Sequence, residues 1–153
     1  MIKHILTLAL CLAASIAHAD GKKLVVVVAR GSSLTNISRV DLKRCFERDP
    51  VSSGDKQLVP FNASSGSPER IGFDRAVLGM DAGEVGRFWV DRKVRGQSDA
   101  PRALPSAAYV VKVVAKFPGA IGYVTQDQLT PELQPVKVEG VAYTDPSYSI
   151  TSE

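Results

Sequence analysis

Histidine and cysteine are scarce in this sequence, and their scarcity excludes several classes of function. The 153-residue chain contains two histidines and two cysteines. Both histidines, His4 and His18, lie near the N-terminus in a segment that reads as an export signal. A processed chain without them has no Ser-His-Asp or Cys-His nucleophile and no histidine-ligated metal site. We therefore expect no catalytic residues, no metal and no cofactor, and a protein that is not an enzyme.

The segment 1–19 is typical of a secretory signal peptide. Lys3 supplies an early positive charge, residues 5–17 are uncharged, and Ala17-His18-Ala19 has the small-x-small pattern that signal peptidase cleaves. The uncharged stretch is too short to span a bilayer. We expect cleavage before Asp20, a periplasmic location and one domain in residues 20–153.

The chain also lacks a large excess of either positive or negative charge. The chain has 19 Lys and Arg against 16 Asp and Glu, a formal net charge of +3. This near balance predicts no basic surface for nucleic acid.

Cleavage would remove Cys11 and leave Cys45 without a disulfide partner. Cys45 shares the apolar side of an expected helix with Leu42 and Phe46, which favours a buried, inert side chain over a reactive thiol.

Hydrophobic patterns and helix caps predict an α/β domain. Leu24–Ala29 is a continuous, valine-rich run, typical of a strand that is covered on both faces. Pro60 indicates that a strand at 58–61 lies at an edge or ends early. We expect a mixed sheet flanked by helices and a loosely held tail from about residue 143. The further strands are expected at 120–124 and 136–139, and the helix N-caps are Ser38, Ser67, Asp81 and Ser106.

Two further patterns have a functional and a structural interpretation. Val85, Phe88 and Trp89 form a stripe on the third helix, which we expect to be buried in the core; the alternative is an exposed face that docks a partner. Ser53 and Lys56 fit the Ser-x-x-Lys pattern of penicillin-interacting serine enzymes. They lie in a Gly-Asp loop without the partner motifs of those enzymes, so we interpret them as a turn.

The most informative local pattern is the serine loop, residues 64–67, and the helix that follows it. Pro68 is favoured as a first helical residue, and Ser67 is a natural N-cap. Free N–H groups at a helix start and serine hydroxyls can bind an anion, and Arg70 lies one turn further on. We predict an anion site formed by Ser65, Gly66, Ser67 and Arg70. Helix capping alone would also explain this pattern.

Several segments within about residues 24–127 form a recognisable combination. They are Leu34-x-x-Ile37-Ser38-x-x-x-Leu42-x-x-x-Phe46, Ser65-Gly66-Ser67, Phe73, Leu78-Gly79, Phe88-Trp89 and the string from Phe117 to Val124. Together these segments resemble the periplasmic phosphate-binding proteins of ABC transporters, and in particular their small single-domain relatives. The resemblance implies a type II periplasmic-binding-protein fold, whose ligand lies in a cleft between two lobes, and the length of this chain corresponds to one lobe.

The serine loop departs from that family at two positions. Phe61 stands where the phosphate binders have arginine, and Ala63 stands where they have aspartate. The lost arginine would donate bidentate, charge-assisted hydrogen bonds to phosphate. The resemblance therefore implies an exported, one-lobed protein that binds phosphate or another small oxyanion weakly, for uptake or sensing.

The partners follow from the same resemblance. A membrane transporter or sensor would receive the ligand, and a homodimer could place two lobes face to face to supply the missing wall. The alternative is a non-enzymatic interaction module that has lost its ligand and docks onto an envelope or membrane partner.

Overall fold

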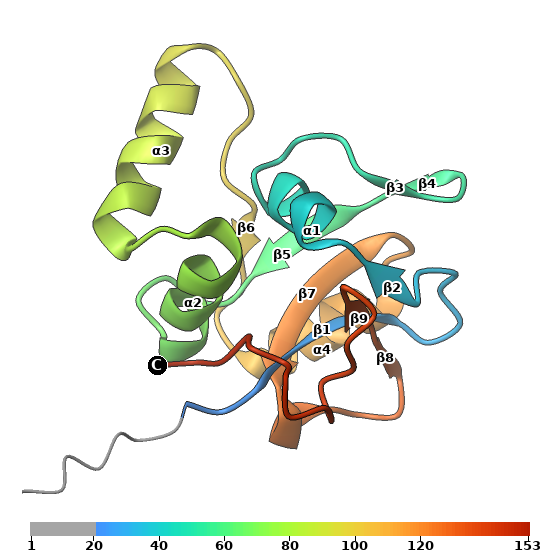
Figure 1. Ribbon diagram of the computed structural model, residues 1–153. Coiled ribbons are helices and arrows are strands. Elements are labelled where there is room, and N and C mark those ends of the chain that lie inside the picture. The colour runs from blue at the N-terminus through green and yellow to red at the C-terminus, as the bar shows by residue number, and fades with distance from the viewer. Residues whose placement is uncertain (1–20) are drawn as a thin grey trace, which may run out of the picture.

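The structure is a computed structural model that describes residues 21–153, so the expected signal peptide and its cleavage site lie outside the described residues. A five-stranded sheet in the order β6-β5-β7-β1-β8 forms its centre (Figure 1). β1 runs antiparallel to β7 and β8, whereas β5 runs parallel to β7 and β6. The sheet is therefore mixed, as predicted. The strands are β1 Leu24–Ala29, β5 Val59–Asn62, β6 Arg102–Ala103, β7 Ala120–Thr125 and β8 Leu133–Pro135.

The helices begin where the capping residues predict. Each predicted N-cap accepts a hydrogen bond from the backbone N–H three residues later. α2 continues directly into a π-helical turn at Asp74–Leu78, which ends at Gly79 with a φ of 72°. None of the helices in residues 21–153 is long and apolar enough to cross a membrane. The helices are α1 Arg39–Phe46, α2 Pro68–Phe73, α3 Ala82–Val94 and α4 Ala107–Lys116, with a 3-10 turn η2 at Gln126–Gln128.

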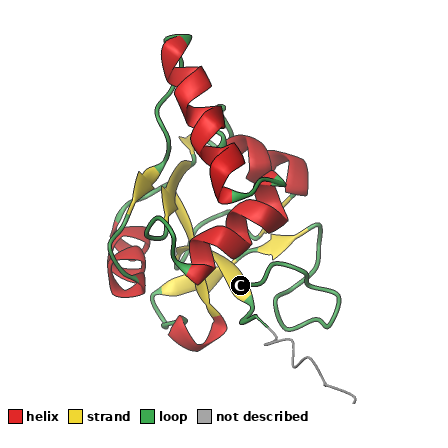
Figure 2. Cartoon of the chain, turned by 90° about the vertical axis from the view of Figure 1, so that its left-hand side faces the viewer, coloured by secondary structure: helices red, strands yellow, loops and turns green. Residues whose placement is uncertain are grey.

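Helices lie on both sides of the sheet, and the alternation of side chains along β1 explains why (Figure 2). Val25 and Val27 belong to the apolar cluster that contains Val110 and Val114 of α4. Leu24, Val26 and Val28 belong to the cluster on the opposite face. Alternate side chains of this apolar run thus pack into two cores, one on each face of the sheet, as expected for a strand that is covered on both faces. The second cluster also contains Leu42, Cys45 and Phe46 of α1, and Phe73 of α2.

β5 lies inside the sheet, which corrects the expectation of an edge strand. β6 lies outside it and pairs only with Phe61 and Asn62. Pro60 is paired with Ile121 of β7 and has no partner on the other side. A proline, which cannot donate a backbone hydrogen bond, is therefore tolerated because β6 ends before reaching it.

The C-terminal tail is packed into the core, so the expectation of a loosely held tail was wrong. Tyr148 and Ile150 are buried, and the Tyr148 hydroxyl donates a 2.9 Å hydrogen bond to the Leu24 carbonyl. The Leu24 N–H in turn donates to the Ile150 carbonyl. The Pro-, Ser- and Thr-rich composition of the tail does not indicate that Tyr148 and Ile150 are buried.

The strand expected at 136–139 is present, but it is shorter than predicted and lies outside the main sheet. β8 ends at Pro135 on the main sheet, and β9 Lys137–Val138 pairs in parallel with β2 Asn36–Ile37. Alternation alone predicts an extended backbone, and it does not predict that the chain changes its pairing partner at Val136.

α3 differs from the other helices, because it extends away from the sheet in Figure 1 and Figure 2. Val85 is the one buried residue among its thirteen. Phe88 and Trp89 are only half-buried, so the expected core stripe is only partly formed. Their rings contact each other edge to face, and the Arg92 guanidinium lies over Phe88.

Candidate functional site

The serine loop lies at the carboxyl end of β5. α/β sheets commonly bind ligands at the carboxyl ends of parallel strands, where the following helices begin. β5 leads into the loop and α2, while its parallel neighbour β6 leads through Leu104 and Pro105 into α4. The N-terminal ends of α2 and α4 therefore lie at the same edge of the sheet.

Tyr123 of β7 fixes the start of the loop. Its hydroxyl donates to Asn62 Oδ1 at 3.3 Å and accepts from the Ala63 N–H at 3.1 Å. Its ring stacks on Phe73 with centroids 3.8 Å apart, which ties the loop to α2. Burial raises the pKa of the Tyr123 phenol well above its ordinary value, so the hydroxyl stays protonated and can donate. The buried Tyr123 hydroxyl thus fixes the start of the serine loop through hydrogen bonds to Asn62 and Ala63.

The serine loop leaves several backbone donors available. Ser67 Oγ accepts from the Arg70 N–H at 3.2 Å, and the Ser67 N–H donates to the Ser64 carbonyl. Gly66 has a φ of 78°, which glycine adopts without strain. Within residues 21–153, the N–H groups of Ser65, Gly66 and Glu69 have no hydrogen-bond acceptor. Unpaired N–H groups at a helix start are the groups that bind anions.

The four predicted site residues divide between two small cavities. Ser65, Gly66 and Arg70 line a cavity of about 50 Å³ together with Asp74. Ser67 lines a second cavity of about 180 Å³, between the starts of α2 and α4. The structure therefore brings three of the predicted residues together and places the fourth on the other side of the loop. The second cavity is also lined by Ser64, Glu69, Ser106, Tyr123 and Gln128.

Arg70 forms an ion pair with a residue that the sequence patterns did not single out. Its Nε lies 2.6 Å from Oδ2 of Asp74, and the two side chains are 12% and 7% exposed. The guanidinium is thus directed along α2 and does not fold back over the helix start. A spacing of four residues is typical of such a helical pair, and it is the signal that could have identified Asp74.

The Arg70–Asp74 pair retains unused hydrogen-bonding capacity. Asp74 Oδ1 is buried and has no partner in the described part of the chain. The two Nη groups of Arg70 likewise make no hydrogen bond to residues 21–153. Burial raises the pKa of the Asp74 carboxyl, and the neighbouring Arg70 partly opposes that rise. The small cavity is therefore lined by an arginine whose charge one carboxylate largely balances.

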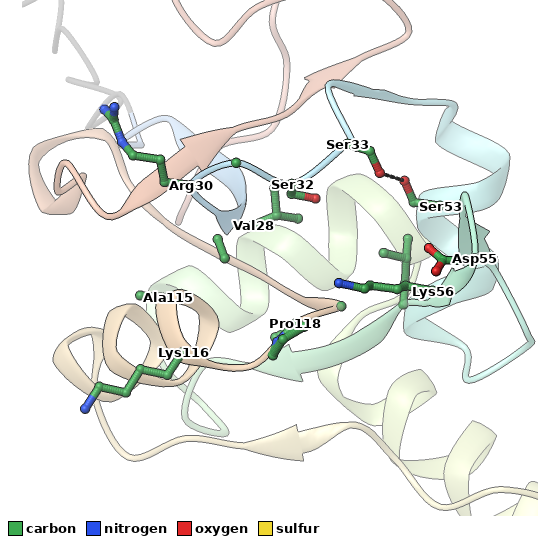
Figure 3. Close-up of a pocket in the computed structure, with 15 residues that line it drawn as sticks. Val28, Arg30, Ser32, Ser33, Ser53, Asp55, Lys56, Ala115, Lys116 and Pro118 are labelled. Carbon is green, nitrogen blue, oxygen red and sulfur yellow. Dashed lines mark hydrogen bonds between the residues drawn. The ribbon is translucent and has the colours of Figure 1, made fainter.

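A larger cavity of about 470 Å³ lies at the opposite end of the sheet, where β7 begins and α4 ends. Figure 3 shows that Lys56 extends into it, whereas Arg30 and Lys116 point away. Ser53 Oγ lies 3.3 Å from Ser33 Oγ. The C-terminal end of α4, which carries the partial negative charge of the helix dipole, lies at this cavity, and Asp55 also lines it. Both negative charges disfavour binding of an anion there.

Ser53 and Lys56 themselves form a turn. They are paired across the two-residue strands β3 Ser52–Ser53 and β4 Lys56–Gln57, and Gly54 at the turn has a φ of 61°. This confirms the interpretation of the Ser-x-x-Lys pattern as a turn.

Comparison with solved structures identifies the fold as one lobe of a type II periplasmic-binding-protein-like architecture. An ABC-type phosphate transport receptor from Vibrio cholerae is 16% identical, with a TM-score of 0.66; the match covers 87% of this chain and 55% of the receptor. A Clostridium perfringens protein, described as a candidate phosphate ABC transporter substrate-binding protein and solved with bound phosphate, is 17% identical, with a TM-score of 0.69 and coverage of 87% and 54%. PstS from Borrelia burgdorferi is 16% identical, with a TM-score of 0.64 and coverage of 88% and 56%.

These matches support the predicted fold. The chain spans about half the length of the phosphate receptors that it matches. No protein-family model matches the sequence, and no curated protein matches it significantly. At this level of identity the likeness concerns the fold, and the chemistry must be argued from the site itself.

Proposed function

We propose that this chain binds a small oxyanion such as phosphate in the 50 Å³ cavity at the serine loop. One observation carries the proposal: Ser65 and Gly66, whose N–H groups have no acceptor within residues 21–153, line the same small cavity as Arg70, whose side chain is mostly buried. Backbone N–H groups and a guanidinium are strong donors to oxyanions, and donors held in a partly dehydrated cavity compete well with water. The Ser65 hydroxyl adds a third kind of donor.

The binding is weak, and Asp74 is the reason. Its carboxylate balances the charge of Arg70 and would lie close to the bound anion. At a separation of about 4 Å, repulsion between like charges costs roughly 1–4 kcal/mol near a protein surface. The phosphate binders' arginine is replaced by Phe61, which also weakens binding, because a phenyl ring cannot donate a charge-assisted hydrogen bond to an anion. Phe61 is half-buried and packs against the apolar cluster that contains Val110 and Val114 of α4.

The proposed role is that of an exported, non-enzymatic solute-binding protein in uptake or sensing. The fold shared with phosphate transport receptors supports this role. A transporter or sensor of the cell envelope would be the partner that receives the ligand. Export rests on the signal-like segment 1–19.

Thermal unfolding with added phosphate or sulfate, against chloride at matched ionic strength, tests this proposal. At a ligand concentration one hundred times above Kd, the native state gains about 2.7 kcal/mol, a clear rise in Tm. Asp74→Asn should strengthen binding by about tenfold, because it removes the repelling charge and keeps an oxygen for Arg70 Nε. Arg70→Gln combined with Asp74→Asn should abolish it without leaving a buried charge.

Ser64→Ala is the matched control, because this neighbouring serine lines the other cavity. It should respond to phosphate as the unmodified chain does. An equal response in all variants would indicate a general salt effect and contradict the proposed site.

The second candidate function is an interaction module that docks onto an envelope partner without a ligand. The observation that favours it is the exposed side of α3, where Val90 is 64% and Val94 is 82% exposed. The absence of a response to any oxyanion, in the unmodified chain and in Asp74→Asn, would favour this function over the first.

A further inference from the structure

α3 is a long helix with little tertiary support. Of its thirteen residues only Val85 is buried, and the helix extends away from the sheet (Figure 1, Figure 2). Isolated helices of this length are marginal in water, and most helices in proteins are stabilised by packing of an apolar face. Gly83 and Gly86 lower the intrinsic helix propensity further. Apart from the side that carries Val85 and Trp89, which packs against the core, α3 therefore lacks a packing partner in the described part of the chain.

The side of α3 that lacks a partner is well defined. At 3.6 residues per turn, Gly83, Gly86, Val90 and Val94 lie along one face, which we call the outward face. Val85, Phe88 and Arg92 lie on the opposite face, and Arg92 donates to the Glu47 carbonyl and pairs with Asp49. A Cβ built on Gly86 would meet no atom within 4 Å, so the surface there is open.

One flank of the outward face carries charges of alternating sign. In chain order they are Glu84, Arg87, Asp91 and Arg95, spaced three or four residues apart. Glu84 accepts from the Asp81 N–H in the capping box, and Arg95 pairs with Asp91 at 3.0 Å, so Arg87 and the exposed Asp91 are the charges that a second copy can reach. If a second α3 lies antiparallel with its centre near residue 89, Arg87 meets Asp91 of the second copy. The twofold symmetry forms this pair of opposite charges twice.

The apolar residues are complementary in size in nearly the same register, with the centre close to residue 88. Gly86 faces Val90 of the second copy, and Gly83 faces its Val94. Each exposed valine thus meets a glycine, which lets the two helices approach closely. The centres that the size pattern and the charge pattern favour differ by about one residue, and both patterns favour an antiparallel pair.

We propose that the outward face of α3 binds the outward face of α3 in a second copy of this chain, forming an antiparallel helix pair with twofold symmetry. Such a contact is self-complementary, as twofold interfaces must be. It buries less surface than a standard stable interface, so the dimer is weak and depends on protein concentration.

Sedimentation equilibrium of the purified protein over about a hundredfold range of concentration tests the proposal. The unmodified chain should shift from monomer to dimer across that range. Val90→Asp should raise the dimer dissociation constant by at least about tenfold, because it places two carboxylates in the centre of the contact. The control is Phe117→Asp, since Phe117 is 60% exposed at the end of α4 and lies outside α3.

Charge exchange tests the register and does not depend on how any single variant folds. Arg87→Asp alone and Asp91→Arg alone should each weaken the homodimer, because like charges then meet. An equimolar mixture of the two variants should restore dimerisation, because each copy then supplies the charge that the other lacks. Circular dichroism of each variant checks that the helices remain folded.

Any of four results would overturn the proposal. The first is a monomer at every concentration, and the second is a dimer that Val90→Asp leaves intact. The third is a mixture of the charge variants that dimerises no better than either alone. Co-sedimentation of a monomeric chain with anionic vesicles, lost in Val90→Asp, would assign the face to a membrane and also contradict the proposal.

Discussion

α3 and α4 both begin at a well-formed cap, and they contribute very differently to the fold. Ser106 caps α4, and Val110 and Val114 are then buried against the sheet. Asp81 and Glu84 form a complete capping box on α3, yet only Val85 is buried behind it. Caps and helical periodicity therefore determine where each helix starts, while packing is determined by the surface that the rest of the fold presents.

This difference predicts how the molecule responds to substitution. Changes on the sheet and on the elements that cover it should destabilise the whole domain. Equivalent changes on α3 should leave the domain folded and act mainly on association. All stabilities below refer to dilute protein, where the proposed dimer is dissociated.

The largest effect is expected from truncating a core aromatic ring. Phe73→Ala should lower the free energy of unfolding by about 3–5 kcal/mol, because Phe73 is fully buried between Phe46 and Tyr123. Phe88→Ala on α3 should cost about 1 kcal/mol, because its half-buried ring contacts mainly Trp89 and Arg92. Urea unfolding measures both, and equal losses would contradict the distinction between the two regions.

The glycines that follow the two helices provide the next comparison. Gly119, after α4, has a φ of 86°, and a Cβ there would lie 2.8 Å from the Gln57 carbonyl oxygen. Gly119→Ala should therefore cost about 2–3 kcal/mol. Gly96, after α3, has a φ of 69° with no atom within 4 Å of a Cβ, so Gly96→Ala should cost about 1 kcal/mol.

Both glycine variants can be compared by their Tm. A Gly96→Ala variant that unfolds as easily as Gly119→Ala would show that the end of α3 is packed more tightly than the structure indicates.

A valine on each helix gives a smaller contrast. Val114→Ala should cost about 2 kcal/mol, because the side chain is fully buried and lies against Gly122. Val94→Ala should stay within about 0.5 kcal/mol of the unmodified chain, because its side chain is exposed and alanine is the better helix former. Chemical denaturation of the pair is the measurement, and a large loss for Val94→Ala would show intramolecular packing of α3.

The smallest effect at neutral pH concerns Cys45 of α1. Burial raises the pKa of its thiol to about 12, while the nearby Arg48 slightly opposes that rise. The unfolded thiol ionises above about pH 8.5 and the native one does not, so this contribution to stability is complete below that pH and is lost as the pH rises towards 12.

Cys45→Ala should therefore lose stability less steeply than the unmodified chain between about pH 9 and pH 11. Tyr148, whose pKa burial also raises to about 12, contributes the same trend to both proteins. At neutral pH the native thiol should react slowly with a thiol reagent and quickly in denaturant. Parallel stability curves for the two proteins would contradict the assignment of this trend to Cys45.

The sequence predicts those parts of the fold that depend on neighbouring residues. β1, β7 and the four N-caps follow from apolar runs and from the backbone hydrogen bonds of Ser and Asp side chains. The packed tail could not be predicted, because Tyr148 and Ile150 are held by Leu24, more than one hundred residues away. The place of β5 inside the sheet depends on the short strand β6, which has no apolar pattern.

Only part of the candidate site could be predicted from the sequence, because some of its features follow from local patterns and others depend on how distant elements pack. The loop amides and the Ser67 cap follow from Ser-Gly-Ser-Pro, which is a local pattern. The orientation of Arg70 depends on Asp74, whose carboxylate is the nearest partner on a helix that continues as a π-turn. The division of the loop between two cavities depends on where α3 and α4 lie against it.

The amide chemical shifts of the serine loop provide the most direct test of oxyanion binding. In a phosphate titration of ¹⁵N-labelled protein at constant ionic strength, we expect saturable shifts at the amides of Ser65 and Gly66 and at the Arg70 side chain. Asp74→Asn should reach saturation at a lower phosphate concentration. Shifts spread evenly over the surface, or confined to the Ser33, Ser53 and Lys56 cavity, would contradict oxyanion binding at the serine loop.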